Sequence, residues 1–473
     1  MDQVLQWAEE EFGQARLGDI RRTRRVVMLG AELARQPAGT VTRACASSAS
    51  REGAFRWLES HAVRVEPVRE ALVRAALGRC AQHELVYVSV DGTSLTLTDK
   101  TGEKGLGAVG SWSMGSHGVH AMTALAVGPD GGPIGICGQR MWVRQSRSRH
   151  ANARRSGDLG ERETRFWLEL LAESHAEFAK SAPGCTPWYQ LDRGADCWPV
   201  LELARRSNLL LTVRATHDRC IDGQAAHLWS VVERSPLKGY LHVDVPAGPG
   251  RRKRQRREGR RVSWKTAPRK ARKAKVAVRA ATVPLRLTTA AGASFTVDFN
   301  AVLVREVGPV KDRLEWLLLT THPVRTRSEA LAVVFGYKHR WRIEELHRTW
   351  KRGLCRVEDT QLRSREAIFK WATLLAAVAS RAMRLTYLAR EQPDLPATEE
   401  LSRVELRALI ALRMPKGVVL GHVPPLSQAV RWLAELGGYT GPWNGPPGPT
   451  VVGRGLRTVL AAARAFENAS KMR

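Results

Sequence analysis

The sequence has little cysteine and no long hydrophobic run. Its seven cysteines form no C-x-x-C pair, which argues against a zinc site and fits a reducing compartment. The longest plain apolar stretch, Trp371 to Ser380, is about half as long as a membrane-spanning helix needs to be. The first residues, Met1-Asp2-Gln3 and then three glutamates at 9–11, lack the basic head and apolar core of a signal peptide. These features predict a cytoplasmic protein.

Acidic residues are also in short supply. The 473 residues include 46 Asp and Glu against 75 Lys and Arg, which gives a formal net charge of +29. Hydrophobic residues make up 43% of the chain, enough for folded cores, so disorder over the whole length is excluded. The length predicts roughly three domains. A positive field of this size predicts a polyanionic partner, and nucleic acid is the first candidate.

The positive charge is concentrated in particular segments. Residues 251–275 contain fourteen Lys and Arg and one acid, Glu258. A run this dense repels itself, which predicts a solvated, partly disordered loop, non-specific phosphate binding, or both. A second cluster follows Asp19, the predicted N-cap of a helix that runs towards Leu33. It suits either a helix end on a DNA backbone or a solvated helix face. The predicted N-terminal DNA contacts are Arg21, Arg22, Arg24, Arg25, Arg51 and Arg56.

The order of the predicted elements indicates a mixed α/β core between two helical regions. Residues 1–72 are typical of short helices without a clear strand. A strand-rich stretch without a convincing helix follows the core, and one long helix is expected from about Ser328 to Arg352. A second helix, at 366–390, leads into a helical tail. The β-β-β-α-β-α-β order of the core comes from predicted elements at 85–90, 119–127, 134–143, 161–180, 188–191, 196–206 and 209–213.

Three acids in this pattern are candidate metal ligands. Asp91 ends the first predicted strand and Asp192 ends the fourth, and in a mixed sheet of this order those strands can lie side by side. Either aspartate alone also fits an ordinary turn. The third acid, Glu344, lies on the predicted long helix. At about 100° per residue, it shares a stripe about 60° wide with three other side chains: Tyr337, Arg340 and Lys351, with Trp341 at the border. A solvated, ion-paired face and a metal ligand beside a phosphate clamp both fit this stripe.

These residues resemble a known family. The segment from Tyr337 through Arg340 and Glu344 to Lys351 resembles the Y-R-E-K signature of bacterial cut-and-paste DDE transposases in insertion-sequence family four, the family of the transposon-five transposase. Further similar segments follow the same order along nearly the whole chain: Asp91-Gly92-Thr93, Leu191-Asp192-Arg193-x-Ala195-Asp196, Trp316-Leu317-Leu318-Leu319-Thr320, Leu17-Gly18-Asp19-x-Arg21-Arg22-Thr23, Glu52-Gly53-Ala54-x-Arg56 and Leu436-Gly437-Gly438.

The resemblance implies an architecture. It predicts a ribonuclease-H-like α/β catalytic core over 73–375, with an all-β insertion at about 216–315 that contains the basic run. A helical domain that binds the DNA ends is expected over 1–72. A helical C-terminal dimerisation domain is expected over 376–473.

The resemblance also implies a mechanism. Asp91, Asp192 and Glu344 would hold two Mg²⁺ or Mn²⁺ ions, since hard cations prefer oxygen ligands. The enzyme would nick the ends of its transposon, form and reopen a DNA hairpin, and join the 3′ ends to target DNA as a nucleoid-associated homodimer. Trp316 would receive a flipped base, because base–aromatic stacking is favourable. The remaining predicted contacts with double-stranded DNA are Tyr337, Arg340, Trp341, Arg348, Lys351 and Arg214.

Two alternatives from other classes stay open at this point. One is a domesticated, sequence-specific DNA-binding protein without catalysis. The other is a ribonuclease-H-like nuclease that cuts DNA but does not join strands. The three acids in order along the chain favour an active enzyme over the first of these.

Overall fold

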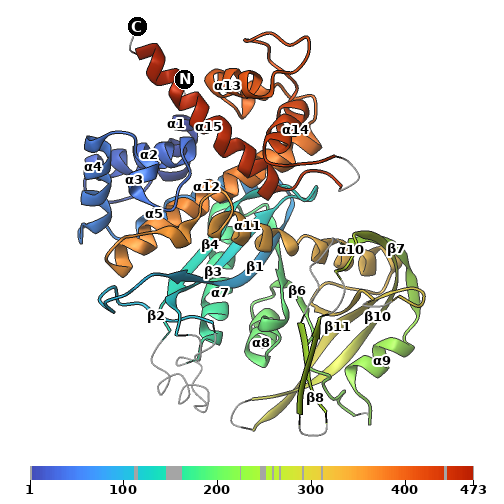
Figure 1. The fold of residues 1–473 in the computed structure, drawn as a ribbon. Coiled ribbons are helices and arrows are strands. Elements are labelled where there is room, and N and C mark those ends of the chain that lie inside the picture. The colour runs from blue at the N-terminus through green and yellow to red at the C-terminus, as the bar shows by residue number, and fades with distance from the viewer. Residues whose placement is uncertain are drawn as a thin grey trace. The chain divides into compact units, whose positions relative to one another are not determined.

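The chain folds into a mixed α/β structure with many helices and a large mixed sheet (Figure 1). This computed structural model divides into two compact units, which we call the first unit (1–190 and 339–473) and the second unit (191–338). In the described part of the chain, no helix has the length and apolar composition needed to cross a membrane. The described residues are 3–110, 115–144, 162–223, 225–245, 252–257, 260–265, 268–289, 292–310, 313–441 and 445–471.

The N-terminal part of the first unit is helical, and its described residues contain no strand before Leu85, as the sequence predicts. The second helix begins where expected, because Asp19 accepts a hydrogen bond from the Arg21 N–H at 2.8 Å and thereby caps it. The predicted domain limit at residue 72 falls inside the fifth helix. The helices are α1 (Gln3–Phe12), α2 (Ile20–Arg35), α3 (Val41–Ala44), α4 (Ser48–Glu59) and α5 (Glu66–Cys80).

The sheet of the first unit has the strand order β4-β3-β1-β5, with the short β2 paired to β3. The first and fourth predicted strands, β1 and β5, are therefore neighbours, which confirms that expectation. The helix α7 (Thr164–Ser181) packs against β3 and β4. The strands are β1 (Leu85–Leu97), β2 (Gly107–Ala108), β3 (His117–Val127), β4 (Pro133–Trp142) and β5 (Thr186–Leu191).

One long helix, α12 (Arg365–Glu391), joins the parts of the first unit, and it matches the helix predicted at 366–390. It contacts α2, α4 and α5, the strand β4, and the C-terminal helices α14 (Leu426–Leu436) and α15 (Pro449–Lys471) (Figure 1). The side chain of Trp371 donates a hydrogen bond to the Gly39 carbonyl at 2.8 Å. The helical tail also includes α13 (Arg403–Arg413). The predicted domain limit at residue 375 falls inside α12.

The second unit contains an antiparallel sheet in the order β6-β12-β11-β10-β7. The helix α10 (Arg327–Lys338) packs on β7, β10 and β11. The expected elements at 196–206 and 209–213 are α8 (Trp198–Arg206) and β6 (Leu210–Arg214). The other strands are β7 (Leu237–Val245), β10 (Arg272–Thr288), β11 (Ser294–Glu306) and β12 (Glu315–Thr320).

The expectation that the insertion is all-β is wrong, because a helix, α9 (Leu228–Arg234), lies within it. Asp218 accepts a hydrogen bond from the Trp229 N–H at 2.9 Å near the start of the helix. Leu228 and Val232, one turn apart, are both buried against β10 and β11. A single pair of buried positions is too short a periodic signal to find in the sequence.

The basic run is also not the loop that the sequence predicts. Its described part forms a two-stranded antiparallel sheet of β8 (Arg252–Arg257) and β9 (Arg260–Lys265) and then enters β10. From Arg272 onwards its backbone pairs with β7, and side chains alternate in exposure, with Ala274 buried and its two lysine neighbours exposed. This alternation lets a basic segment pair as a strand while its charges stay in water. Residues 251, 258–259 and 266–267 lie outside the described residues.

The single helix expected at 328–352 is in fact two helices, α10 and α11 (Trp341–Lys351). The His339 carbonyl accepts hydrogen bonds from the Arg342 N–H at 2.9 Å and from Ser89 Oγ at 3.0 Å. The Ile343 N–H then bonds to Arg340 instead of to His339, so the regular four-residue ladder is interrupted. The His339 ring is buried against Tyr87, with ring centres 5.0 Å apart.

Candidate active site

Two acids of the first unit come together on β1 and α11, which pack against each other. The prediction that Asp91 ends its strand is wrong, because β1 continues to Leu97. Asp91 lies inside the strand, opposite Thr123 of β3. Its half-buried carboxylate accepts a hydrogen bond from the Gly92 N–H at 2.7 Å. Glu344 lies in the first turn of α11 and is also half-buried.

The guanidinium of Arg340 joins these two acids. One nitrogen lies 2.6 Å from Glu344 Oε1, and the other lies 3.9 Å from Asp91 Oδ2. The Arg340 side chain is only 13% exposed, so bulk water screens these interactions less than on an open surface. Two carboxylates and one guanidinium leave this cluster with a net charge of about −1.

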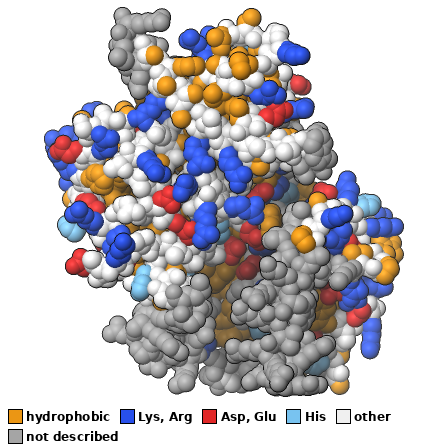
Figure 2. All heavy atoms as spheres, in the orientation of Figure 1, with side chains coloured by type: hydrophobic (Ala, Val, Ile, Leu, Met, Phe, Trp, Pro, Cys, Tyr) orange, Lys and Arg blue, Asp and Glu red, His pale blue; other side chains and the backbone are white. Residues whose placement is uncertain are grey.

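A second cation follows on the same face of α11. Lys351 lies seven residues after Glu344, which returns it to nearly the same side of the helix. Its Nζ contacts Thr93 Oγ1 at 3.4 Å and Glu358 at 3.5 Å. Glu358 also pairs with Arg352 at 3.1 Å. Figure 2 shows Lys and Arg side chains gathered around α11, with Asp and Glu side chains among them.

The predicted four-residue stripe is therefore only partly correct. Arg340, Glu344 and Lys351 lie together in the first unit, but Tyr337 belongs to α10 in the second unit, because the helix is interrupted at His339. Arg348 and Trp341, two further predicted DNA contacts, are exposed on α11.

Other side chains of α11 anchor the helix. Glu345 accepts a hydrogen bond from the Tyr387 hydroxyl at 2.6 Å and pairs with Arg342 at 3.2 Å. Arg342 also donates to the Gly131 carbonyl at 2.9 Å. Burial, with a smaller contribution from the charge of Lys351, lowers the pKa of His347 to about 3. The imidazole is therefore neutral at physiological pH and adds no charge to the face that carries Glu344.

The second unit holds the other predicted site residues. Asp192 follows β5 directly, as predicted, and its carboxylate accepts a hydrogen bond from the Gly194 N–H at 2.8 Å. Trp316 and Tyr337 contact each other edge to face, with ring centres 5.3 Å apart. Trp316 is half-buried and Tyr337 is buried. Arg214 donates a hydrogen bond to the Glu315 carbonyl at 2.8 Å, so at least part of its role is structural.

The acid pair on β1 and α11 has the chemistry of a site for a hard divalent cation. Both donors are carboxylate oxygens, the ligand type that Mg²⁺ and Mn²⁺ prefer, and a cationic group already lies between them. Within each unit by itself, the described residues contain no group of three Asp, Glu, His or Cys side chains placed to hold one ion.

The predicted N-terminal DNA contacts fall into two groups. Arg22 and Arg25 are half-buried and donate to backbone carbonyls, Arg22 to Leu17 at 3.0 Å and Arg25 to Ser50 at 2.5 Å. Arg51 is also half-buried, whereas three others are exposed: Arg21, which pairs with Asp19 at 3.0 Å; Arg24; and Arg56, which pairs with Glu52.

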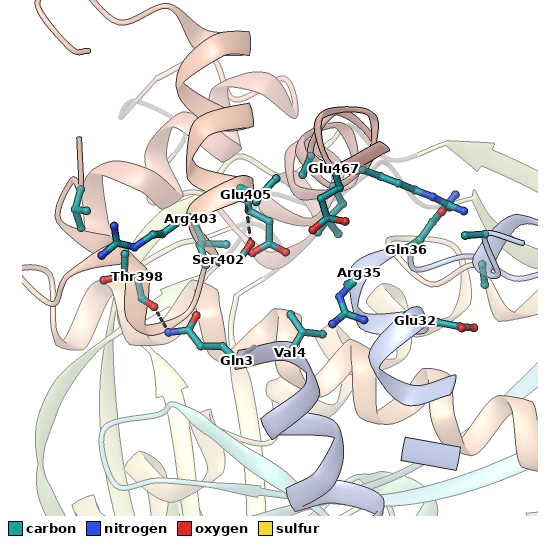
Figure 3. Close-up of a pocket in the computed structure, with 18 residues that line it drawn as sticks. Gln3, Val4, Glu32, Arg35, Gln36, Thr398, Ser402, Arg403, Glu405 and Glu467 are labelled. Carbon is teal, nitrogen blue, oxygen red and sulfur yellow. Dashed lines mark hydrogen bonds between the residues drawn. The ribbon is translucent and has the colours of Figure 1, made fainter. Parts of the chain in front are cut away.

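A pocket of about 610 Å³, which no sequence pattern indicates, lies in the helical part of the first unit. Side chains from α1, α2, α13 and α15 line it, and Figure 3 shows Arg35 and Glu405 pointing into the space between these helices. Gln3 of α1 donates a hydrogen bond to the Thr398 carbonyl at its edge. None of the predicted site residues lines this pocket, whose residues are too far apart in the chain for a sequence pattern to reveal it.

Two family models match the chain. A transposase DNA-binding model matches residues 5–63, which cover most of α1 and all of α2, α3 and α4. A transposase DDE domain model matches residues 201–380, which contain Glu344. The solved structure of a piggyBac transposase synaptic complex with hairpin DNA is similar with a TM-score of 0.34 and 9% identity, covering 83% of this chain and 74% of that chain. That likeness is too low to assign a fold. The two family models together indicate a DDE transposase that carries its own DNA-binding segment.

Proposed function

We propose that this chain is a bacterial cut-and-paste transposase of insertion-sequence family four, which cuts DNA with Asp91, Asp192 and Glu344. The observation that carries the proposal is the contact of Arg340 with both Asp91 and Glu344. Glu344 and Arg340 lie within the segment that matches the DDE domain model. Their neighbours on α11 repeat the spacing of the family signature.

In this proposal the three carboxylates hold Mg²⁺ or Mn²⁺, two ions per site. When bound, divalent ions activate the attacking oxygen and stabilise the leaving 3′-oxygen. Arg340 and Lys351 bind the phosphates beside the scissile bond, since both cations lie on the Glu344 face of α11. Tyr387 and Arg342 hold Glu345, and so fix the helix that orients Glu344.

The DNA path in the proposal uses both units. Trp316 receives a base that unstacks when the DNA end bends into a hairpin, and its edge-to-face contact with Tyr337 holds its ring in place. The segment of α1 to α4, in which Arg21 and Arg24 are exposed, binds the terminal inverted repeats. Two copies of the chain pair the two ends, with α14 and α15 of the C-terminal region as the proposed dimer contact.

The experiment is a DNA cleavage and joining assay with duplexes taken from the DNA that flanks the gene. With Mg²⁺ or Mn²⁺ we expect a nick at the element's end, then a hairpin, then joining of the 3′ end to a target plasmid. With a chelator in place of the metal, binding persists and none of these products forms. DNA binding without any nick in either metal would contradict the proposal and support the alternative of a sequence-specific DNA-binding protein without catalysis. Nicking of the full-length substrate without joining of pre-cut ends would support the alternative of a nuclease that does not join strands.

A further inference from the structure

We propose that Arg340 is an internal counter-ion which holds Asp91 and Glu344 until a DNA phosphate draws it away, so that DNA binding and metal binding are coupled. The inference rests on the proposed function, because it concerns the same acids, and it adds a control that the function does not require. It makes Arg340 a competitor of the metal ion as well as a ligand of DNA.

The Arg340 guanidinium occupies the place that a metal ion would need. It lies 2.6 Å from Glu344 and 3.9 Å from Asp91, on the space between the two acids where a shared cation would also have to lie. A guanidinium and a divalent ion cannot both occupy that space. In the absence of DNA, a metal ion must therefore displace Arg340 from Glu344, and this displacement weakens metal binding.

The charge of the cluster changes when Arg340 leaves. Asp91, Glu344 and Arg340 together carry about −1, and His347, one turn after Glu344 on α11, is neutral because burial lowers its pKa to about 3. If Arg340 leaves, the two acids carry about −2, which one divalent ion neutralises. The acid pair is then both vacated and more negative, and both changes favour the metal ion.

A DNA phosphate can draw the Arg340 side chain away from the two acids. The planar guanidinium can donate two parallel hydrogen bonds to a DNA phosphate, as it can to a carboxylate, and the phosphate is negatively charged. Arg340 directly precedes the first helical residue of α11, so its side chain can rotate without moving the helix that carries Glu344. Lys351 on the same face is already held by Glu358, not by Glu344 or Asp91. Lys351 can therefore bind a phosphate without changing the charge of the acid pair.

The test is Mn²⁺ binding, measured from the electron paramagnetic resonance signal of unbound Mn²⁺, for wild type, Arg340→Gln and Arg352→Gln. Without DNA we expect Arg340→Gln to bind Mn²⁺ about tenfold more tightly than wild type, within the usual range for coupled sites. Arg352→Gln, the matched control at the end of the same helix, removes an exposed cation that pairs with Glu358 and should bind Mn²⁺ as wild type does. Adding a duplex from the gene's flanking DNA should tighten Mn²⁺ binding to wild type but not to Arg340→Gln.

Equal or weaker Mn²⁺ binding by Arg340→Gln without DNA would overturn the inference, and so would a DNA effect that survives in this variant. Arg340→Lys, which keeps the charge but not the two-pronged reach, guards against misfolding of the Gln variant and should bind Mn²⁺ with intermediate affinity. Failure of the coupling is separable from failure of the proposed function. If wild type cuts DNA and Glu344→Gln does not, the function stands whatever the Arg340 variants show.

Discussion

The two cationic helices, α2 and α11, use their charged side chains differently. On α2, Arg22 and Arg25 donate to backbone carbonyls and so hold α2 to its surroundings. At the start of α11, Arg340 pairs with two of the acids proposed to hold metal, and at its end Lys351 pairs with Glu358. A cluster of positively charged residues thus contributes to packing in one helix and to the candidate site in the other. What separates the two is the partner of the less exposed arginines, which is a backbone carbonyl for Arg22 and Arg25 and a carboxylate for Arg340.

Replacing Glu344 on α11 should have the strongest effect on DNA cleavage. Glu344→Gln should lower the rate of DNA nicking by at least about a thousandfold, because loss of a metal ligand removes several kcal/mol of transition-state stabilisation. Binding to end DNA should persist. The matched control is Glu345→Gln on the same helix, which still accepts the Tyr387 hydroxyl and should keep near wild-type nicking. Equal losses in both variants would show that Glu344 acts only through folding.

The next effect concerns the packing role on α2. Arg25→Gln should lower the free energy of unfolding by about 1.5–3 kcal/mol, because it removes a charged donor from the Ser50 carbonyl. Arg24→Gln, one residue earlier and exposed, should leave stability unchanged. Urea denaturation of both variants measures this difference. An unchanged free energy of unfolding in Arg25→Gln would contradict the packing role and leave Arg25 among the proposed DNA contacts.

The stability contributed by the buried side of α11 should depend on pH because it includes His347. The buried side chains described on α2 include no titratable group. The folded pKa of His347, about 3, lies below its usual 6.5. Between these values the unfolded chain binds the proton and the folded chain does not, so stability falls as pH drops. The slope is up to about 1.4 kcal/mol per pH unit. His347→Gln should flatten the dependence of unfolding free energy on pH between about 6 and 4; an unchanged slope would assign it to other groups.

The smallest effect compares exposed cations on the two helices. Arg24→Gln and Arg348→Gln should each reduce the log–log dependence of DNA affinity on salt by about 0.9, the change expected for one phosphate contact. Fluorescence anisotropy at several salt concentrations measures this slope. Arg22→Gln should leave the slope unchanged, since its guanidinium bonds to the Leu17 carbonyl.

Elements with a strong local pattern could be predicted from the sequence. Apart from the short β2, which the sequence does not predict, the order from β1 to β6 follows from periodicity. The capping of α2 by Asp19 and the extent of α12 likewise follow from patterns within one segment. The neighbourhood of β1 and β5 followed from the order of elements alone.

Features that depend on contacts distant in sequence could not be predicted. The break before α11 needs Ser89, which lies 250 residues before its partner His339. The divided roles of the α2 arginines depend on carbonyls at Leu17 and Ser50, and the contact of Arg340 with Asp91 depends on how α11 packs on β1. The helix stripe that Glu344 shares with Arg340 and Lys351 already indicates a candidate ligand, and the resemblance agrees, but only the structure places Asp91 near it.

The central claim is that Asp91, Asp192 and Glu344 hold the same metal ions. Its most direct test replaces Mg²⁺ by Fe²⁺ in the DNA complex and adds ascorbate and peroxide, so that radicals cut the polypeptide next to bound iron. Mass spectrometry of the fragments should then show cuts beside residues 91, 192 and 344 together, and all three should disappear in Glu344→Gln. Cuts elsewhere, or cuts beside only one or two of these acids, would contradict the claim.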